Sequence, residues 1–291
     1  LIHKDGQWAP NHFLVQKQDG AFNYATTDLA TLAFRVSTWH ADAIVYVTDG
    51  RQQLHFRQLF ATFRRWQPQA KTSLDHVWFG SILGEDGKPF RTRAGDTVRL
   101  SELLDEAEER ALNVVSEKSP ALPEADRRQI ARLVGIGAVK YADLLPNRQT
   151  DYVFSWDKML ALNGNTAPYL LYAYARIQSI FRKGNLAPLA SDIPAGSSPT
   201  LELDAPQELN LAKHLLNLNL VLEAVAAEFR PNFLCNYLYE LAGLFTSFYE
   251  NCPVLKAEPA RRQSRLRLCD LTARALKLGL GLLGIEVVDQ M

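Results

Sequence analysis

The pattern of hydrophobic and polar residues changes near residue 100. Before that point, a short apolar run rich in β-branched residues at 44–47 and a second apolar run at 77–83 flank a stretch at 54–63 whose apolar residues recur at near-helical spacing. This alternation predicts the strands and helix of a parallel α/β layer. From Ser101 onward, the apolar residues keep a helical period almost to the end, interrupted where proline and glycine cluster. The sequence therefore predicts an α/β part followed by an all-α part.

The length of the chain supports two domains. With 291 residues, each of two domains can bury its own core. We expect residues 1–148 to hold the α/β layer and its connecting helices, and residues 149–291 to form a helical bundle. Hydrophobic residues make up 47% and charged residues 22%, which is typical of a folded globular protein and excludes a disordered one.

Charge, hydropathy and cysteine usage narrow the class of protein. Lysine plus arginine and aspartate plus glutamate both number 32, so any contact with nucleic acid must come from local patches. No apolar run approaches the roughly 20 residues of a membrane span. The three cysteines form no Cys-x-x-Cys pair, which favours buried thiols in a cytoplasmic setting over disulfides or a zinc site. Because the sequence begins with Leu1 rather than methionine, we also expect a fragment of a longer protein.

A tyrosine and an aspartate lie four residues apart early in the α/β part. Thr26 and Thr27 can cap a helix that begins near Asp28, and Tyr24 and Asp28 then face one pocket. The alternative is that Asp28 only stabilises a helix N-terminus.

Polar and basic residues follow both predicted strands. Gln52 and His55 come just after the first strand, where open parallel sheets present ligand-binding loops, although a purely structural role is at least as common for a lone histidine. Lys88, Arg91 and Arg93 place three cations within six residues. Taken by itself, a short basic segment of this kind is most often a solvated surface loop.

Aromatic residues gather on helix faces in the all-α part. Tyr169 and Tyr172 lie three residues apart, and Arg176 follows one turn further along. Unpaired bases stack on aromatic rings while arginine binds phosphate, so this face suits RNA. An aromatic stripe is also typical of a helix core, to which we assign Phe245 and Phe248.

Three stretches resemble, in this order, the C-terminal two-thirds of a bacterial arginyl-tRNA synthetase. They are Tyr-Ala-Thr-Thr-Asp at 24–28, Asn-Thr-Ala-Pro-Tyr at 165–169, and the closing residues 282–291. These synthetases belong to class I. The resemblance implies part of a Rossmann-type class I catalytic domain with connecting helices over 1–148, followed by a helical-bundle anticodon-binding domain over 149–291.

The resemblance also implies roles for individual residues. The positions that match arginine-binding residues are Tyr24, Asp28 and Gln52. Those on the ATP side are His55, Lys88 and Arg93. The segment with Lys88, Arg91 and Arg93 occupies the place of the loop that clamps the phosphates of ATP during catalysis, although its Lys-Met-Ser-Lys-Ser motif is absent. The tRNA-binding positions are Tyr169, Tyr172, Arg176, Tyr249 and Met291.

The implied activity is that of an arginine–tRNA ligase. ATP, accompanied by Mg²⁺, activates arginine with release of pyrophosphate, and the arginyl group passes to tRNA(Arg) without a prosthetic group. We expect a monomer that has no membrane contact and binds tRNA(Arg), arginine and ATP. The six histidines form no His-x-Gly-His signature, so the chain alone is expected to be inactive.

Two other interpretations stay open. The chain can be a stand-alone tRNA-binding module whose α/β part is only structural, or an unrelated α/β enzyme with a helical tail. An upstream His-x-Gly-His segment in the intact gene would distinguish a synthetase from the stand-alone module.

Overall fold

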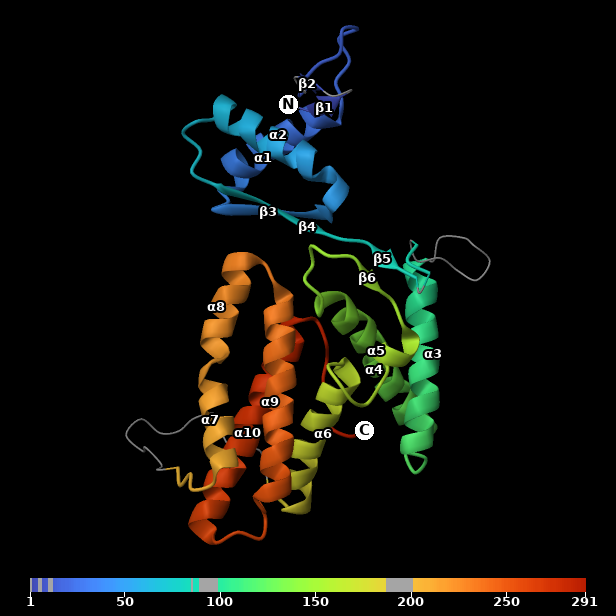
Figure 1. Cartoon of the computed structure of the whole chain (residues 1–291), viewed down its shortest axis with the longest axis vertical. Coiled ribbons are helices and arrows are strands. Elements are labelled where there is room, and N and C mark those ends of the chain that lie inside the picture. The colour runs from blue at the N-terminus through green and yellow to red at the C-terminus, as the bar shows by residue number, and fades with distance from the viewer. Residues whose placement is uncertain (1, 5–6, 10–12, 85, 89–98, 187–200) are drawn as a thin grey trace. The chain divides into compact units, whose positions relative to one another are not determined.

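The chain forms two compact units (Figure 1). The computed structural model describes residues 2–4, 7–9, 13–84, 86–88, 99–186 and 201–291. The first unit consists of Leu1–Ser81 with Gln149–Asp151, and the second of Ile82–Arg148 with Tyr152–Met291. A compact unit need not coincide with a domain, so the expected domain boundary at residue 148 stays a prediction. Of the predicted basic segment, Lys88 is described, whereas Arg91 and Arg93 lie outside the described residues.

The first unit contains the predicted α/β layer. Strands β3 (Ala43–Asp49) and β4 (Ser73–Phe79) pair in parallel, and helix α2 (Gln53–Trp66) connects them after a 3-10 turn, η1 (Gly50–Gln52). Helix α1 (Tyr24–Trp39) packs beside α2. A small antiparallel pair, β1 (Ile2–Lys4) and β2 (Gln7–Ala9), precedes them. The core of the unit consists of apolar residues from both helices and both parallel strands, namely Leu29, Leu32, Ile44, Phe56, Leu59, Phe63 and Leu74.

Helix α1 begins at Tyr24, so the predicted start near Asp28 was wrong. Asn23 caps the helix in place of the predicted threonines, because its Oδ1 accepts the N–H groups of Ala25 at 3.0 Å and Thr26 at 3.3 Å. Asparagine is at least as good an N-cap as threonine, which explains the earlier start. Tyr24 and Asp28 therefore lie one turn apart on the same face of α1.

The predicted strand at 77–83 is interrupted. Its last part is β5 (Ile82–Leu83), which pairs in parallel with β6 (Tyr152–Val153) in the second unit. The interruption falls at Gly80, where an added Cβ would stand 2.6 Å from the carbonyl oxygen of Thr150. A glycine in a strand pattern often marks such a close approach of two backbones.

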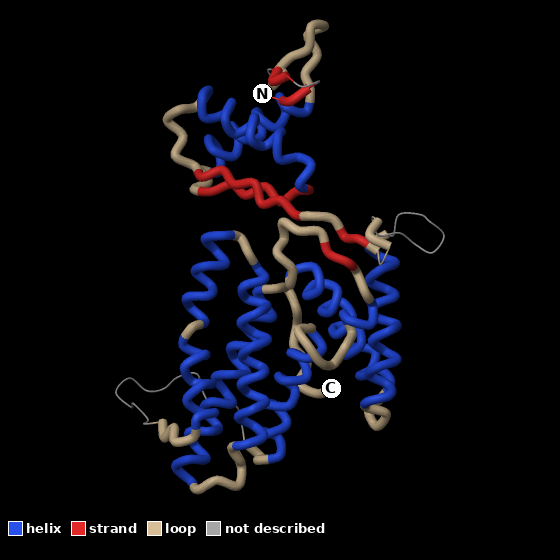
Figure 2. The backbone as a smooth tube through the Cα atoms, viewed as in Figure 1, coloured by secondary structure: helices blue, strands red, loops and turns tan. Residues whose placement is uncertain are grey.

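The second unit is mainly helical (Figure 2). Its helices are α3 (Leu100–Lys118), α4 (Glu124–Leu144), α5 (Trp156–Met159), α6 (Ala167–Lys183), α7 (Pro206–Leu216), α8 (Leu218–Glu228), α9 (Pro231–Asn251) and α10 (Pro259–Leu282). α3 and α4 form a hairpin, and α9 contacts α4, α6, α7, α8 and α10. The predicted all-α part is confirmed.

One hydrophobic core runs through this second unit from α3 to the end of the chain. Helix α9 contributes fully buried side chains to it, among them Leu238, Leu241, Phe245 and Phe248. The assignment of Phe245 and Phe248 to the core is therefore confirmed. Burial of each such side chain contributes about 1.5 to 3 kcal/mol of stability. Because α9 also contacts most of the other helices of the unit, it is the central helix of the bundle.

The cysteines and the hydropathy of the helices fit the sequence analysis. Cys235, Cys252 and Cys269 are free and buried. Burial raises the pKa of the Cys235 thiol to about 12, so this group stays protonated and packs as a small apolar residue. Within the described part of the chain, no helix is both long and apolar enough to cross a membrane.

Candidate functional site

Tyr24, Asp28 and His55 form a cluster in the first unit. The first two project from neighbouring turns of α1, and His55 projects from the first turn of α2. Nε2 of His55 lies 2.7 Å from Oδ2 of Asp28, and the ring centroids of His55 and Tyr24 are 4.9 Å apart. The two helices meet because both bury apolar faces in the same core. Two residues predicted to bind arginine thus lie beside one predicted to bind ATP.

The cluster is enclosed on the histidine side and more open on the aspartate side. The side chain of His55 is 13% exposed, with the rings of Phe13 and Phe56 at 5.8 Å and 5.2 Å. In contrast, the side chain of Asp28 is 36% exposed and Tyr24 is 69% exposed. Nε2 of His55 contacts Oδ2, and within the described residues Oδ1 has no hydrogen-bond partner, so it remains for another group. A planar cation can pair with this carboxylate and lie against the tyrosine ring.

Gln52, the third residue predicted to bind arginine, lies at the end of η1, just before α2. Asp49 holds the turn by accepting the N–H of Arg51 at 2.8 Å and its guanidinium Nε at 2.8 Å. These bonds from Arg51 keep the pKa of Asp49 below its ordinary value. Gln52 is exposed, and in the described part of the chain no interaction joins it to Asp28. The structure therefore positions Gln52 beside the helix that carries His55, without bringing it into the cluster.

A second group of predicted residues meets on α6 and α9. The guanidinium carbon of Arg176 lies 4.8 Å from the ring centroid of Tyr172 and 5.4 Å from that of Tyr249. The two tyrosines are 41% and 39% exposed, so both rings remain accessible. Each cation–π contact at such an exposed site contributes about 0.5 to 1 kcal/mol, which fixes the arginine against the rings.

These three residues line an open cavity of about 720 Å³, which we call the tyrosine cavity. Its other walls are the α3–α4 connection at 118–122 and the residues Gln290 and Met291. Four of the five residues predicted to bind tRNA therefore come together, namely Tyr172, Arg176, Tyr249 and Met291. An aromatic and cationic cavity of this kind suits the stacking of an unpaired base beside a phosphate.

Three further cations line the tyrosine cavity and were missed from the sequence. Lys118 lies in the last turn of α3, and Arg182 and Lys183 lie in the last turn of α6. A basic residue in that position ordinarily stabilises the C-terminal end of its own helix, so nothing local indicated a ligand. Their convergence depends on how the α3–α4 hairpin packs, through α4, against α6.

Tyr169 lies outside the tyrosine cavity. It is half-buried against the core of the bundle, and its ring meets that of Tyr239 at 5.7 Å with an interplanar angle of 61°. Edge-to-face pairs of this kind are typical of packed aromatic residues. Its role in tRNA binding stays a prediction.

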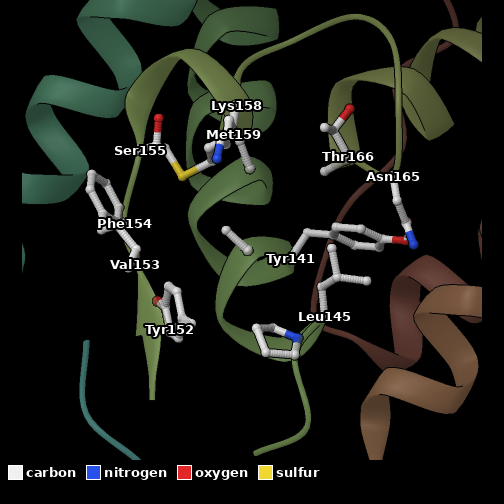
Figure 3. Close-up of a pocket in the computed structure, with 14 residues that line it drawn as sticks. Tyr141, Leu145, Tyr152, Val153, Phe154, Ser155, Lys158, Met159, Asn165 and Thr166 are labelled. Carbon is white, nitrogen blue, oxygen red and sulfur yellow. Dashed lines mark hydrogen bonds between the residues drawn. The ribbon is translucent and has the colours of Figure 1, made fainter. Parts of the chain in front are cut away.

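A separate, mainly apolar pocket of about 210 Å³ lies between α4, the start of α6 and the segment with β6 and α5 (Figure 3). Tyr141 points across it, and its hydroxyl lies 2.5 Å from Oδ1 of Asn165 and 2.9 Å from the carbonyl oxygen of Cys235. Burial raises the pKa of Tyr141, so the hydroxyl keeps its proton. These contacts tie α4 to the N-terminus of α6 and to α9, and we assign the pocket a structural role.

Two family models match the chain. The model for the catalytic domain of class I (R) tRNA synthetases matches residues 6–156, and the model for the DALR anticodon binding domain matches residues 170–291.

Individual relatives agree with these family matches. The chain is 53% identical to an arginine–tRNA ligase of Cellvibrio japonicus, over 100% of the chain and 49% of that protein. It is also 53% identical to an arginine–tRNA ligase of a Synechocystis strain, over 100% of the chain and 50% of that protein. The chain thus spans about half the length of the curated relatives it matches.

Solved structures give the same result. The arginyl-tRNA synthetase of Plasmodium falciparum has a TM-score of 0.81 and 31% identity, covering 99% of this chain and 48% of that one. The Thermus thermophilus enzyme has a TM-score of 0.82 and 27% identity, covering 96% and 51%.

Proposed function

Because the chain belongs to the class I tRNA synthetases for arginine, we propose that the whole protein is an arginine–tRNA ligase. In this proposal, residues 1–148 supply part of the catalytic domain and residues 149–291 supply the anticodon-binding domain. The observation that carries the proposal is the half-exposed carboxylate of Asp28, which has one oxygen against His55 and an exposed tyrosine ring one turn away.

Asp28 is the residue that recognises the arginine side chain. A guanidinium is planar, always charged and able to donate two parallel hydrogen bonds, so it matches a carboxylate better than lysine does. Tyr24 offers an exposed ring on which the guanidinium plane can stack. Gln52, at the end of the turn after β3, lies against the bound arginine in this proposal.

Catalysis rests on positioning and charge stabilisation. The carboxylate of arginine attacks the α-phosphate of ATP in line, the bond to pyrophosphate breaks, and arginyl-adenylate forms. Lys88, Arg91 and Arg93 neutralise the departing pyrophosphate, and Mg²⁺ enters bound to ATP. Lys88 is exposed at the end of a turn that the hydrogen bond from Gly84 N–H to the Lys88 carbonyl closes at 2.8 Å. His55 completes the ATP side of this site.

The tyrosine cavity binds the anticodon loop of tRNA(Arg). Its exposed rings can stack on unpaired bases, at about 1 to 3 kcal/mol for each base. The cations around it can pair with the phosphates on either side, which gives a local basic patch on a chain with no net charge. We include Tyr169 among the residues that act on this side of the protein.

ATP–pyrophosphate exchange tests the proposed activity. With tRNA(Arg) present, the full-length protein should exchange pyrophosphate into ATP when arginine is supplied and not when arginine is withheld. The 291-residue chain should show no exchange, because it lacks a His-x-Gly-His signature. Absence of arginine-dependent exchange by the full-length protein would refute the proposal.

We further propose that the protein is a monomer and that it acts in the cytoplasm. The three buried free thiols fit a reducing compartment of this kind.

A second candidate is a tRNA-binding module without catalysis. The observation in its favour is that residues of the second unit alone line the tyrosine cavity. Under this alternative, the full-length protein binds tRNA(Arg) but shows neither exchange nor aminoacylation.

A further inference from the structure

The segment Gly284–Met291 crosses α4 and ends at the tyrosine cavity. Helix α10 stops at Leu282, and Gly284 turns the chain away with a φ of 71°. Side chains within the segment are buried, with Ile285 at 2% and Val288 at 6% exposed. Its last residue, Met291, lines the cavity. We call this segment the strap.

Two cations from other helices hold the backbone of the strap. Nζ of Lys140 on α4 donates to the carbonyl oxygen of Gly284, and Nη1 of Arg182 on α6 donates to that of Asp289 at 2.8 Å. A hydrogen bond from a charged donor is stronger than one between neutral groups. The strap is therefore fixed near both of its ends, and both bonds fall on main-chain atoms.

The surface of α4 also matches the shape of the strap. Gly137 lies one turn before Lys140, and an added Cβ at that position would stand 3.0 Å from Cγ2 of Ile285. The glycine allows Ile285 to approach the helix closely. Both residues lie outside the tyrosine cavity, so neither touches a ligand there.

We propose that Lys140 is a positioning residue for the nucleic-acid site, acting through the strap to set where Gln290 and Met291 stand in the wall of the tyrosine cavity. The inference rests on the proposed function and deepens it. Stacking rings accept every base, so discrimination among bases must come from other groups that contact base edges. In this proposal, Gln290 and Met291 of the strap supply such groups, and they discriminate among bases only if the strap holds them in a fixed position.

The test measures binding of the 291-residue chain to a fluorescent stem–loop with the anticodon loop of tRNA(Arg), and to loops in which each unpaired base is replaced in turn. The ratio of Kd values between replaced and native loops gives the discrimination. Lys140→Met should lower this ratio by a few-fold at one or more loop positions, as expected for a residue that acts on the site through a packed segment. Lys140→Arg, which can still donate to Gly284, should restore it.

Arg132→Met is the matched control. Arg132 is exposed on the same face of α4 and carries the same charge, but in the described part of the chain it makes no hydrogen bond to the strap. Its loss should weaken all loops equally through charge and leave the ratio unchanged. Gly137→Ala, which pushes Ile285 outward, should lower the ratio of Kd values as Lys140→Met does. This second variant tests the inference if Lys140→Met is too unstable to assay.

A chain without Gln290 and Met291 provides the decisive background. If Lys140 acts through the strap, Lys140→Met should change the discrimination no further there, because coupled residues are not additive. An undiminished effect in the shortened chain, or a uniform loss for all loops as in Arg132→Met, would overturn the inference. If the unmodified chain binds no loop at all, the proposed anticodon site itself is wrong, and the inference falls with it.

Discussion

Nε2 of His55 lies 2.7 Å from Oδ2 of Asp28, although the two residues are 27 positions apart in the sequence. This contact joins α2 to α1 at the place where the arginine side chain is proposed to bind. It fixes one oxygen of the carboxylate and leaves the other available, so the histidine orients the group that carries specificity. Because Nε2 is engaged with Asp28, a contact of His55 with ATP has to be made through the other ring nitrogen, Nδ1.

Asp28→Asn should raise the KM for arginine far more than the KM for ATP in the full-length protein. Removal of a charge-assisted contact costs about 1.5 to 3 kcal/mol, which corresponds to roughly ten- to a hundredfold. Steady-state pyrophosphate exchange at varied arginine and varied ATP measures both constants. Equal increases in the two constants would assign Asp28 to fold stability instead.

His55→Phe should also raise the KM for arginine, because phenylalanine keeps the ring packing but cannot donate to Asp28. His55→Gln serves as the conservative variant, since its amide N–H can reach the same carboxylate. We expect His55→Gln to stay within a few-fold of the unmodified protein and His55→Phe to lose about tenfold. If both variants raise the KM for ATP and leave that for arginine unchanged, His55 acts on ATP alone.

Tyr172→Ala and Tyr249→Ala should weaken tRNA binding with little effect on melting temperature. Both rings are exposed in the tyrosine cavity, and loss of one stacked base costs about 1 to 3 kcal/mol. Tyr174→Ala is the control for packing, because Tyr174 is 4% exposed on the same helix and truncation of a buried aromatic costs about 3 to 5 kcal/mol of stability.

For Tyr169, thermal melts and tRNA titrations together distinguish a packing role from a role in tRNA binding. It was predicted to bind tRNA, but its ring packs on Tyr239. Melts and tRNA titrations of Tyr169→Ala should therefore be run together. A lower melting temperature with normal tRNA affinity assigns Tyr169 to packing, and the reverse keeps it in the tRNA site.

Glu208→Gln should destabilise the second unit at neutral pH and less so in acid. Oε1 of Glu208 lies 2.6 Å from Nε of Arg265, and the side chains are 0% and 11% exposed. Burial alone raises the pKa of Glu208, but the N–H of Ala205 and the guanidinium of Arg265 outweigh it and hold the pKa below 4.5. A lowered pKa stabilises the folded state above pH 4.5, and this contribution is lost as the pH falls below that value.

The matching measurement compares melting of Glu208→Gln and the unmodified chain at pH 7 and near pH 3. Loss of one partner of a buried ion pair costs about 3 kcal/mol at pH 7. The difference between the two proteins should shrink in acid. A difference that stays constant with pH would mean that the charge of Glu208 contributes nothing.

Much of the fold could be predicted because it follows from local chemistry. Short apolar runs predicted the parallel layer and a helical period predicted the bundle, since each pattern reflects which residues a strand or helix buries. The start of α1 was placed wrongly because Asn23 and Thr26 are both good caps and only the packed structure shows which one is used. The interruption at Gly80 depends on Thr150, which no local pattern connects to it.

Some features of the candidate site could likewise be predicted from the sequence, and others could not. Tyr172 and Arg176 lie one turn apart on one helix, so their shared face was visible in the sequence. Lys118 reaches the tyrosine cavity only because the α3–α4 hairpin packs beside α6, and Lys140 meets Gly284 only because the strap crosses α4. Contacts between distant segments depend on tertiary packing, and spacing along the chain does not reveal them.

Aminoacylation of tRNA(Arg) with arginine and with citrulline tests the central claim most directly. Citrulline has nearly the same shape as arginine but carries no charge on its side chain. The full-length protein should charge arginine with a much higher kcat/KM than citrulline, and Asp28→Asn should reduce that preference by roughly ten- to a hundredfold. Failure of the full-length protein to charge arginine, or a preference for arginine that Asp28→Asn leaves unchanged, would contradict the proposed function of this site.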